Sequence, residues 1–347
     1  MMKLCVFNPE HDLALAANLS NFTAPHAGRQ LRADLGYLPA LWAAADDLVL
    51  VDQVEDAERR YRILTRRPFG RFITQEMLPE YTFQAVDVWG WDKAVRTFLL
   101  RHGVNASVLP GEDTLDMIRL LSHRRQAVNL LSRLQMDGTT GCSFEACTMD
   151  DVIRYLNDYR HIVVKAPWSS SGRGVRFIEG ELNSCHLGWI HHVIERQGSV
   201  IVEPYYNKVK DFGMEFESDG TGMVHYLGLS LFQTRNGAYT GNVIASEEEK
   251  VDMISRYVSV DLLNKVQKTV CTWLGPLCQG KYQGSLGVDM MIVARQDQDG
   301  FLLHPCVEIN LRRTMGHVAL AAHSLLQRPL VMQITLTDKY RIKLLKQ

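Results

Sequence analysis

Residues 161–179 read HIVVKAPWSSSGRGVRFIE, in which an apolar strand ends at Lys165 and a segment of Ser and Gly leads into a second apolar strand. Small residues let backbone N–H groups approach an anion closely, and a lysine at a strand end supplies a compact positive charge. This combination suits the phosphates of a nucleoside triphosphate. The alternative is an ordinary hairpin beside a solvent-facing lysine, because Ser and Gly turns between strands are common.

The stretch is not a P-loop, because in a P-loop the lysine follows the glycines and precedes Ser or Thr. Residues 275–281 do match the spacing GxxxxGK, but Tyr282 stands where Mg²⁺ needs a hydroxyl group of Ser or Thr. They also follow a predicted helix rather than a strand. A P-loop is therefore not expected in this chain.

A second polar cluster lies in the segments GVDMMIV and HPCVEINLRRTMGH. If these are adjacent strands, Asp289, Glu308 and Asn310 project into one site, since Glu308 and Asn310 lie two apart on one face. Two carboxylates and an amide oxygen are hard ligands that Mg²⁺ accepts, with phosphate oxygens and water. Arg312 shares that face and could hold an anionic substrate or a phosphoryl group. The alternative is a pair of salt-bridged acids at a sheet edge.

The pattern of apolar residues changes along the chain, and its best early boundary lies at residues 108–114. Short strand-like and helical runs mix through residues 1–110 and predict an N-terminal α/β domain. Residues 111–205 begin with a helical block, in which Thr148 and Asp151 form a capping box, and contain the Ser/Gly loop. Residues 206–347 carry the acid cluster, and Gly316–Leu326 is predicted as a closing helix.

The composition limits the class of partner and the compartment. The chain has 347 residues, 46% of them hydrophobic, with 38 Lys and Arg against 39 Asp and Glu. This balance removes the electrostatic reason to expect nucleic acid or an anionic membrane as a partner. The apolar run at the N-terminus is shorter than a signal peptide requires. No segment has the apolar length of a membrane span. Seven cysteines without a CxxC pair suit a reducing cytoplasm.

The motifs occur in a characteristic order: Lys165, the Ser/Gly segment, IVEPYY, VKDF, GVDMMIV and VEINLR. Together they resemble the ATP-grasp superfamily over about residues 110–325. The resemblance implies an α/β (α+β) protein in which two α+β subdomains clasp the nucleotide after the N-terminal domain. It also implies an ATP-dependent ligase that joins a small carboxylic acid to an amine through an acylphosphate. The alternatives are a small-molecule kinase of the same fold and a nucleotide-binding module without chemistry.

The resemblance also assigns roles around the nucleotide. Lys165 resembles the lysine that contacts the α- and β-phosphates of ATP. The loop that closes over the triphosphate corresponds to Ser169, Ser170, Ser171, Gly172 and Gly174. Glu203 and Tyr205 fall at the linker that usually holds adenine, and Asp211 falls where an acid commonly binds the ribose hydroxyls.

For the metal and the transferred group, the resemblance assigns Asp289, Glu308 and Asn310 as ligands of Mg²⁺ or Mn²⁺. Arg312 matches the arginine of an E-x-N-x-R ending and is expected to act in catalysis. Such proteins usually carry an earlier lysine in the helical block. Here the corresponding stretch SHRRQAVNLL offers Arg124 or Arg125 instead.

Glu10 and His11 follow Pro9, where the first predicted strand would end. Loops at the ends of such strands are a common place for ligands, so these two side chains could contact substrate. The alternative is that the segment caps a helix through Asn8 or Asp12. The residue types name no ligand, and both interpretations stay open.

Overall fold

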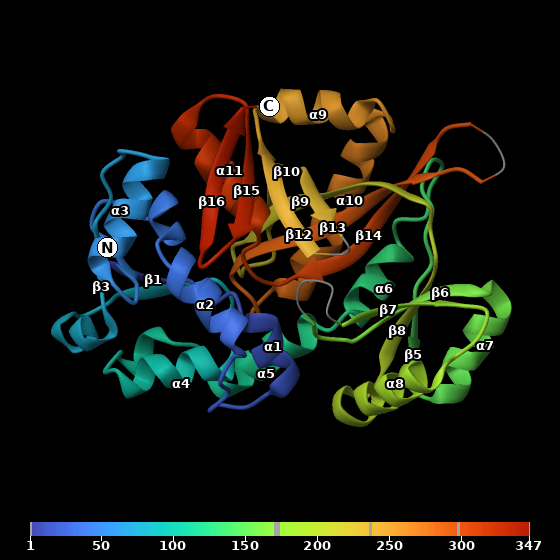
Figure 1. Ribbon diagram of the computed structural model, residues 1–347, viewed down its shortest axis with the longest axis horizontal. Coiled ribbons are helices and arrows are strands. Elements are labelled where there is room, and N and C mark those ends of the chain that lie inside the picture. The colour runs from blue at the N-terminus through green and yellow to red at the C-terminus, as the bar shows by residue number, and fades with distance from the viewer. Residues whose placement is uncertain (1, 170–173, 236–237, 297–298, 347) are drawn as a thin grey trace. The chain divides into compact units, whose positions relative to one another are not determined.

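The computed structural model describes residues 2–169, 174–235, 238–296 and 299–346 (Figure 1). Contacts divide the chain into two compact units. Unit 1 comprises Met1–Arg119, Thr240–Glu247 and Leu311–Gln347, and unit 2 comprises Leu120–Tyr239 and Glu248–Asn310. Residues 240–247 and 311–347 thus group with the N-terminal residues. The predicted domain boundaries after residues 110 and 205 stay predictions.

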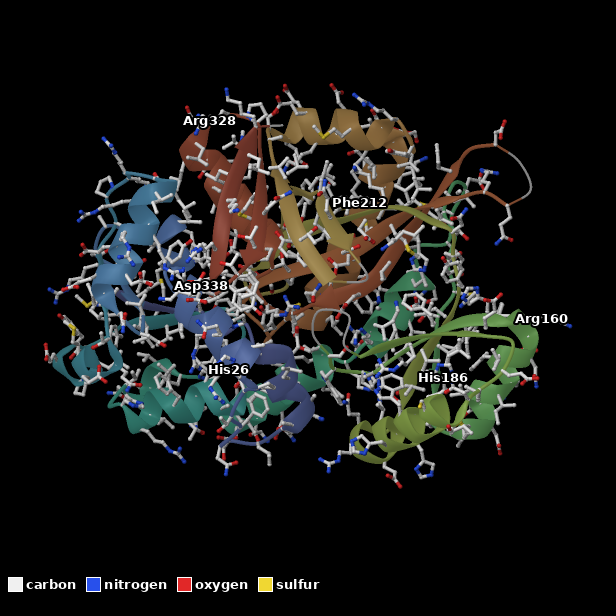
Figure 2. All side chains as sticks on the ribbon, in the orientation of Figure 1. His26, Arg160, His186, Phe212, Arg328 and Asp338 are labelled. Carbon is white, nitrogen blue, oxygen red and sulfur yellow. The ribbon has the colours of Figure 1, made fainter. Side chains whose placement is uncertain are left out.

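Unit 1 is built on a parallel sheet in the order β3-β2-β1-β4. Its strands are β1 (Lys3–Val6), β2 (Leu48–Leu50), β3 (Arg71–Ile73) and β4 (Ala85–Val88). The helices of this part of the chain are α1 (His11–Ala17), α2 (His26–Leu35), α3 (Val54–Leu64), α4 (Lys93–Arg101) and α5 (Glu112–Leu121), with 3₁₀ turns Leu38–Leu41, Gln75–Glu80 and Ala106–Val108. Figure 2 labels His26, the first residue of α2. The α/β prediction for the N-terminal domain is confirmed.

A later part of the chain completes unit 1. Strands β12 (Ala238–Ile244), β15 (Leu330–Leu336) and β16 (Tyr340–Lys346) pair antiparallel, and α11 (Met315–Leu326) precedes β15. Figure 1 shows β15 and β16 beside α11. Ile244, Val318 and Met332 share a buried core with Val49 of the parallel sheet. This shared core explains why residues far apart in sequence form one unit.

The first sheet of unit 2 has the order β5-β8-β6-β7, with antiparallel pairing throughout. It contains β5 (Phe144–Ala146), β6 (His161–Lys165), β7 (Val175–Glu179) and β8 (Val200–Pro204). Helices α7 (Met149–Tyr159) and α8 (Ser184–Gln197) contribute to the core on one face of this sheet, and α6 (Arg125–Leu131) precedes β5. The predicted capping box of Thr148 and Asp151 is present at the start of α7.

The second sheet of unit 2 has the order β10-β9-β13-β14. It contains β9 (Lys208–Ser218), β10 (Val224–Ser230), β13 (Gly284–Ala294) and β14 (Phe301–Asn310), accompanied by β11 (Phe232–Arg235), α9 (Glu247–Ser255) and α10 (Val260–Cys278). Phe212, labelled in Figure 2, and Phe216 are fully buried side chains of β9. Gly275 lies inside α10, so residues 275–281 do not form a P-loop, as expected.

Two findings bear on the expected compartment. In the described ranges no helix combines the length and apolarity that crossing a membrane requires. All seven cysteines are free thiols.

Candidate functional site

Lys165 ends strand β6 but does not face solvent. Its side chain is 9% exposed, and Nζ lies 2.6 Å from Oε2 of Glu203 on the neighbouring strand β8. The other carboxylate oxygen of Glu203 accepts a hydrogen bond of 3.3 Å from Ser143. A buried ion pair loses the solvation of both charges, so this pair is costly unless it has partners or a function. Strands β6 and β7 do pair antiparallel, but the solvent-facing lysine of the alternative interpretation is excluded.

Arg124 joins three parts of unit 2 at this place. It precedes α6, is 7% exposed, and its guanidinium contacts the carbonyl oxygen of Ala166. It also donates to Oγ of Ser169 at 2.7 Å and to Oε1 of Glu308 at 2.7 Å. Its Nε is buried and has no hydrogen-bond partner among the described residues. The guanidinium thus connects the end of β6, the start of the Ser/Gly loop and an acid of β14.

Arg125 is placed differently from its neighbour Arg124. Its side chain is 41% exposed and pairs at 2.8 Å with Glu145 of β5. Of the two arginines that stand where an early lysine was expected, Arg124 is the one that contacts Ser169 and Glu308. Sequence reasoning left this choice open.

The predicted metal ligands come together on two adjacent strands. Asp289 of β13 stands directly opposite Glu308 of β14 in the antiparallel register. Asn310 lies two residues farther along β14, and its Nδ2 donates to Oδ2 of Asp289 at 3.1 Å. Clusters of three or more His, Cys, Asp or Glu suited to a metal are absent from the described residues, and this set has two acids and an amide. Two carboxylates and an amide oxygen nevertheless fit the oxygen preference of Mg²⁺ and Mn²⁺.

Arg312 belongs by its contacts to unit 1. Its Nε and Nη2 donate to the two carboxylate oxygens of Asp12 in α1, at 2.9 and 2.8 Å. This is the bidentate geometry that guanidinium groups form with carboxylates. Arg312 is therefore held by Asp12, the residue that follows Glu10 and His11. Its catalytic role stays a prediction.

The face of the first sheet that carries Lys165 also carries aromatic side chains. His161 lies four residues before Lys165 on β6, so the two side chains share a face. The ring of His161 stacks on Tyr205, with centroids 3.9 Å apart and a 3° interplanar angle. Phe177 of β7 meets Tyr205 edge-on at 6.2 Å and is 60% exposed. An exposed aromatic surface of this kind can pack against a flat ring.

The remaining predicted nucleotide residues are placed in part. Oδ2 of Asp211 accepts hydrogen bonds from Lys208 at 2.6 Å and from Thr234 at 2.7 Å. Ser169 is buried, and a side chain on Gly174 would collide with it, since a Cβ there would lie 2.3 Å from that of Ser169. Ser170, Ser171 and Gly172 lie outside the described residues.

His304 was missed by sequence reasoning. It is fully buried on β14, and both ring nitrogens lack hydrogen-bond partners within the described ranges. Burial lowers the pKa of His304 to about 4, while the charge of Glu203 opposes this shift. The ring packs edge-on against Tyr206 at 5.2 Å. The signal was its position four residues before Glu308, because residues an even number apart on a strand tend to share a face.

The similarity of this chain to known proteins lies in its structure. No protein-family model and no curated protein sequence matches the chain. Solved structures do match. N5-carboxyaminoimidazole synthetase from Staphylococcus aureus, complexed with ADP, is 13% identical, with 96% of this chain and 82% of that chain covered and a TM-score of 0.50.

Two biotin carboxylase structures match equally well. A beta-gamma-ATP complex of the enzyme from Campylobacter jejuni is 12% identical, with 99% of this chain and 73% of that chain covered and a TM-score of 0.50. The biotin carboxylase domain of 2-oxoglutarate carboxylase from Hydrogenobacter thermophilus, complexed with MgADP, ADP and bicarbonate, is 10% identical, covers 96% of this chain and 74% of that chain, and has a TM-score of 0.51. The protein has the ATP-grasp fold, as the ordered motifs predicted.

Proposed function

We propose that the protein is an ATP-dependent ligase that joins a small carboxylic acid to an amine through an acylphosphate. The observation that carries the proposal is the arrangement in unit 2, where the buried Lys165 and Arg124 accompany two opposed acids on an ATP-grasp fold. Structures of the same fold that bind ADP or MgADP support ATP as the nucleotide. A reducing compartment such as the cytoplasm is supported by the free cysteines.

The cationic side chains would bind the triphosphate. Lys165 would exchange its contact with Glu203 for the α- and β-phosphates, and the positive charge of Arg124 supports the same role. The loop between Ser169 and Gly174 would exclude water from the reacting groups. Its sequence includes Ser170, Ser171 and Gly172. Excluding water protects an acylphosphate, which hydrolyses readily. The aromatic surface at Tyr205 would hold the base beside Glu203, and Asp211 would bind the ribose.

The acidic side chains would hold the metal. Asp289, Glu308 and Asn310 offer the oxygen ligands that Mg²⁺ or Mn²⁺ prefers. Such an ion neutralises the negative charge of the phosphates when it is bound. Glu308 would keep one oxygen for the ion while the other accepts from Arg124, because the two oxygens of a carboxylate can serve different partners. Arg312 would offset the charge that develops on the transferred phosphoryl group.

The reaction would proceed in two displacements. The carboxylate oxygen of the acid attacks the γ-phosphorus and ADP leaves, which gives the acylphosphate. The amine nitrogen then attacks the acyl carbon, inorganic phosphate leaves, and an amide remains. Because phosphoryl transfer asks mainly for positioning and charge neutralisation, the cations and acids of unit 2 are the groups that it needs.

Hydroxylamine tests this proposal, because it converts an acylphosphate to a stable hydroxamate. The purified protein is incubated with ATP, Mg²⁺ and hydroxylamine, together with each member of a panel of small carboxylic acids that includes bicarbonate. We expect at least one acid to give ADP, with hydroxamate in equal amount for the organic acids, and Glu308→Gln to abolish both products. ADP formed with an alcohol and without hydroxamate would assign a kinase instead. No ADP with any acid or alcohol would contradict both enzymes.

A further inference from the structure

The parallel sheet of unit 1 reverses its strand order between β1 and β4. Strands β2 and β3 lie on one side of β1, and β4 lies on the other. In open α/β sheets, ligands bind beyond the carboxyl ends of the strands at such a reversal. The segments that follow these ends here are residues 7–12 after β1 and 89–92 after β4. Trp89 N–H donates to the carbonyl oxygen of Val6 at 2.8 Å, so the two ends adjoin.

A buried hydrogen-bond network joins these two segments. Nδ2 of Asn8 donates to the carbonyl oxygen of Gly90 at 2.8 Å and to Oδ2 of Asp92 at 3.2 Å. The same Oδ2 lies 3.1 Å from Nδ1 of His11, while Oδ1 accepts from Val95 N–H at the start of α4. Gly90 leaves room for the histidine ring, because a Cβ there would lie 2.5 Å from ring carbons of His11.

The network fixes the chemistry of His11. An ionised carboxylate only accepts hydrogen bonds, so Nδ1 of His11 carries the proton that Asp92 accepts. Nε2 of a neutral ring is then an acceptor, and it makes no hydrogen bond within the described residues. A carboxylate behind the ring also stabilises the imidazolium if Nε2 takes up a proton.

Oε2 of Glu10, the neighbour of His11, is a second acceptor without a donor among the described residues. The residue is 8% exposed, and its Oε2 is buried without a hydrogen-bond partner in the described part of the chain. Burial raises the pKa of Glu10, opposed by the charge of Arg32 and helped by that of Asp92. Oε1 accepts from Arg32 at 2.7 Å, and the Arg32 side chain is 42% exposed. The group that covers Glu10 is therefore a surface side chain that can move.

We propose that residues 7–12 and 89–92 form a second small-molecule site, which binds an amine through the carboxylate of Glu10 and Nε2 of His11. Two acceptors without donors call for a ligand with several N–H groups, and a negative carboxylate favours one that carries positive charge. A primary ammonium has both properties. The ammonium can pass one proton to Nε2 of His11, and the electron pair of the broken N–H bond stays on the amine nitrogen, which leaves a neutral amine and an imidazolium that faces Asp92.

Arg312, for which a catalytic role is proposed, is held at this edge of unit 1. Its guanidinium is held by Asp12, the residue after His11, and Arg313 N–H donates to the carbonyl oxygen of Trp89 at 2.8 Å. An amine is also the class of the second substrate in the proposed ligase reaction. The site itself stands on the contacts of unit 1 and does not depend on nucleotide chemistry.

A panel of methylamine, ethanolamine, glycinamide and putrescine tests the site, with tetramethylammonium as a cation that has no N–H group. Binding is measured by the shift of the unfolding temperature and by NMR of histidine labelled with ¹⁵N. We expect at least one amine to bind and to move the His11 signals, which His11→Gln identifies by their loss. Glu10→Gln is nearly isosteric and should weaken binding about tenfold or more, because a hydrogen bond to a charged group is lost.

Glu58→Gln is the matched control, because Glu58 lies in unit 1 and pairs with Arg62 on the exposed face of α3. It should bind amines like the unchanged protein. The proposal is overturned if no amine binds, if tetramethylammonium binds equally, or if Glu10→Gln and His11→Gln both bind amines normally. ATP with Mg²⁺ is titrated in the same samples. Its effect reports on the proposed nucleotide site, so failure of the amine site and failure of the proposed function are distinguished.

Discussion

Unit 1 and unit 2 each bury a cluster of opposed charges, but the two clusters differ in their bases. Unit 2 buries Lys165 against Glu203 and Arg124 against Glu308, so its bases are an ammonium and a guanidinium group. Unit 1 sets His11 against Asp92, so its base is an imidazole ring with one donor and one acceptor nitrogen. Ammonium and guanidinium groups suit phosphates, and an imidazole ring suits a ligand that offers an N–H group. The difference assigns separate chemistry to the two units.

Replacing Lys165 should have the largest effect. In Lys165→Met, the triphosphate loses a buried positive charge, and we expect turnover to fall about 10³-fold, as when a preorganised electrostatic contact is removed. ATP should also cease to stabilise the protein. The measurements are ADP formation and the unfolding temperature with and without ATP.

The matched control for Lys165→Met is Lys250→Met. Lys250 is another buried lysine of unit 2, and its Nζ donates to the carbonyl oxygen of Leu229 at 2.6 Å. This variant should lose stability and keep its response to ATP. Equal responses to ATP in both variants would show that Lys165 is a structural lysine.

His304 of unit 2 contrasts with His11 because no carboxylate of the described residues forms a hydrogen bond with its ring. Its pKa is about 4 in the folded protein against 6.5 for a histidine in water, so the unfolded chain binds the proton first as pH falls. Stability is therefore lost between pH 6.5 and pH 4, by about 3 kcal/mol from this group.

The pH effect is measured by urea unfolding of the unchanged protein and of His304→Leu at several pH values. Other acids titrate in both proteins, so the difference between the two isolates the histidine. It should shrink by about 3 kcal/mol from pH 7 to pH 4. A difference that stays constant with pH would mean that His304 finds a partner for its charge.

Glu308 and Glu145 provide a direct test of the acid cluster. Both pair with an arginine, at 2.7 and 2.8 Å, and both side chains are 26% exposed. Glu308→Gln should weaken the affinity for Mg²⁺ in the ATP complex about 100-fold, because the ion loses a charged ligand. Glu145→Gln should leave it unchanged. Calorimetric titration of ATP at several Mg²⁺ concentrations measures both, and equal effects would argue against a metal site at Glu308.

Gly90→Ala should have the smallest effect, and it falls on unit 1. The new Cβ would lie 2.5 Å from the ring of His11, so the ring or the loop must shift, at a cost of about 2 kcal/mol. Gly111→Ala is the control, because a Cβ at Gly111 meets nothing within 4 Å. Urea unfolding compares the two. A Gly90→Ala protein as stable as Gly111→Ala would mean that the packing around His11 is loose.

Local signals predicted much of unit 2. Alternation and polar turns gave the strands β13 and β14, and their pairing places Asp289 opposite Glu308 as expected. The capping box of α7 depends on Thr148 and Asp151, which are three residues apart and can be recognised from sequence. These features depend on neighbouring residues or on one hairpin, and for that reason the sequence shows them.

Long-range features were not accessible in the same way. Asn8 and Asp92 form a hydrogen bond although more than eighty residues separate them in sequence. No local pattern around either residue predicts this contact. Arg124 could be chosen over Arg125 only when its contact with Glu308 was seen. Strands β15 and β16 were missed although the apolar residues of LVMQITL and YRIKLLK flank a polar turn. That pattern predicts a hairpin and could have been used.

The central claim is that unit 2 binds ATP through Lys165 with a divalent metal. The most direct measurement is the unfolding temperature with ATP and Mg²⁺, compared with GTP, ADP and metal-free ATP, and repeated on Lys165→Ala. Saturating ATP with Mg²⁺ should stabilise the protein by about 3 kcal/mol at one hundred times the dissociation constant. The effect should need the metal and vanish in the variant. No shift with any nucleotide would contradict the account.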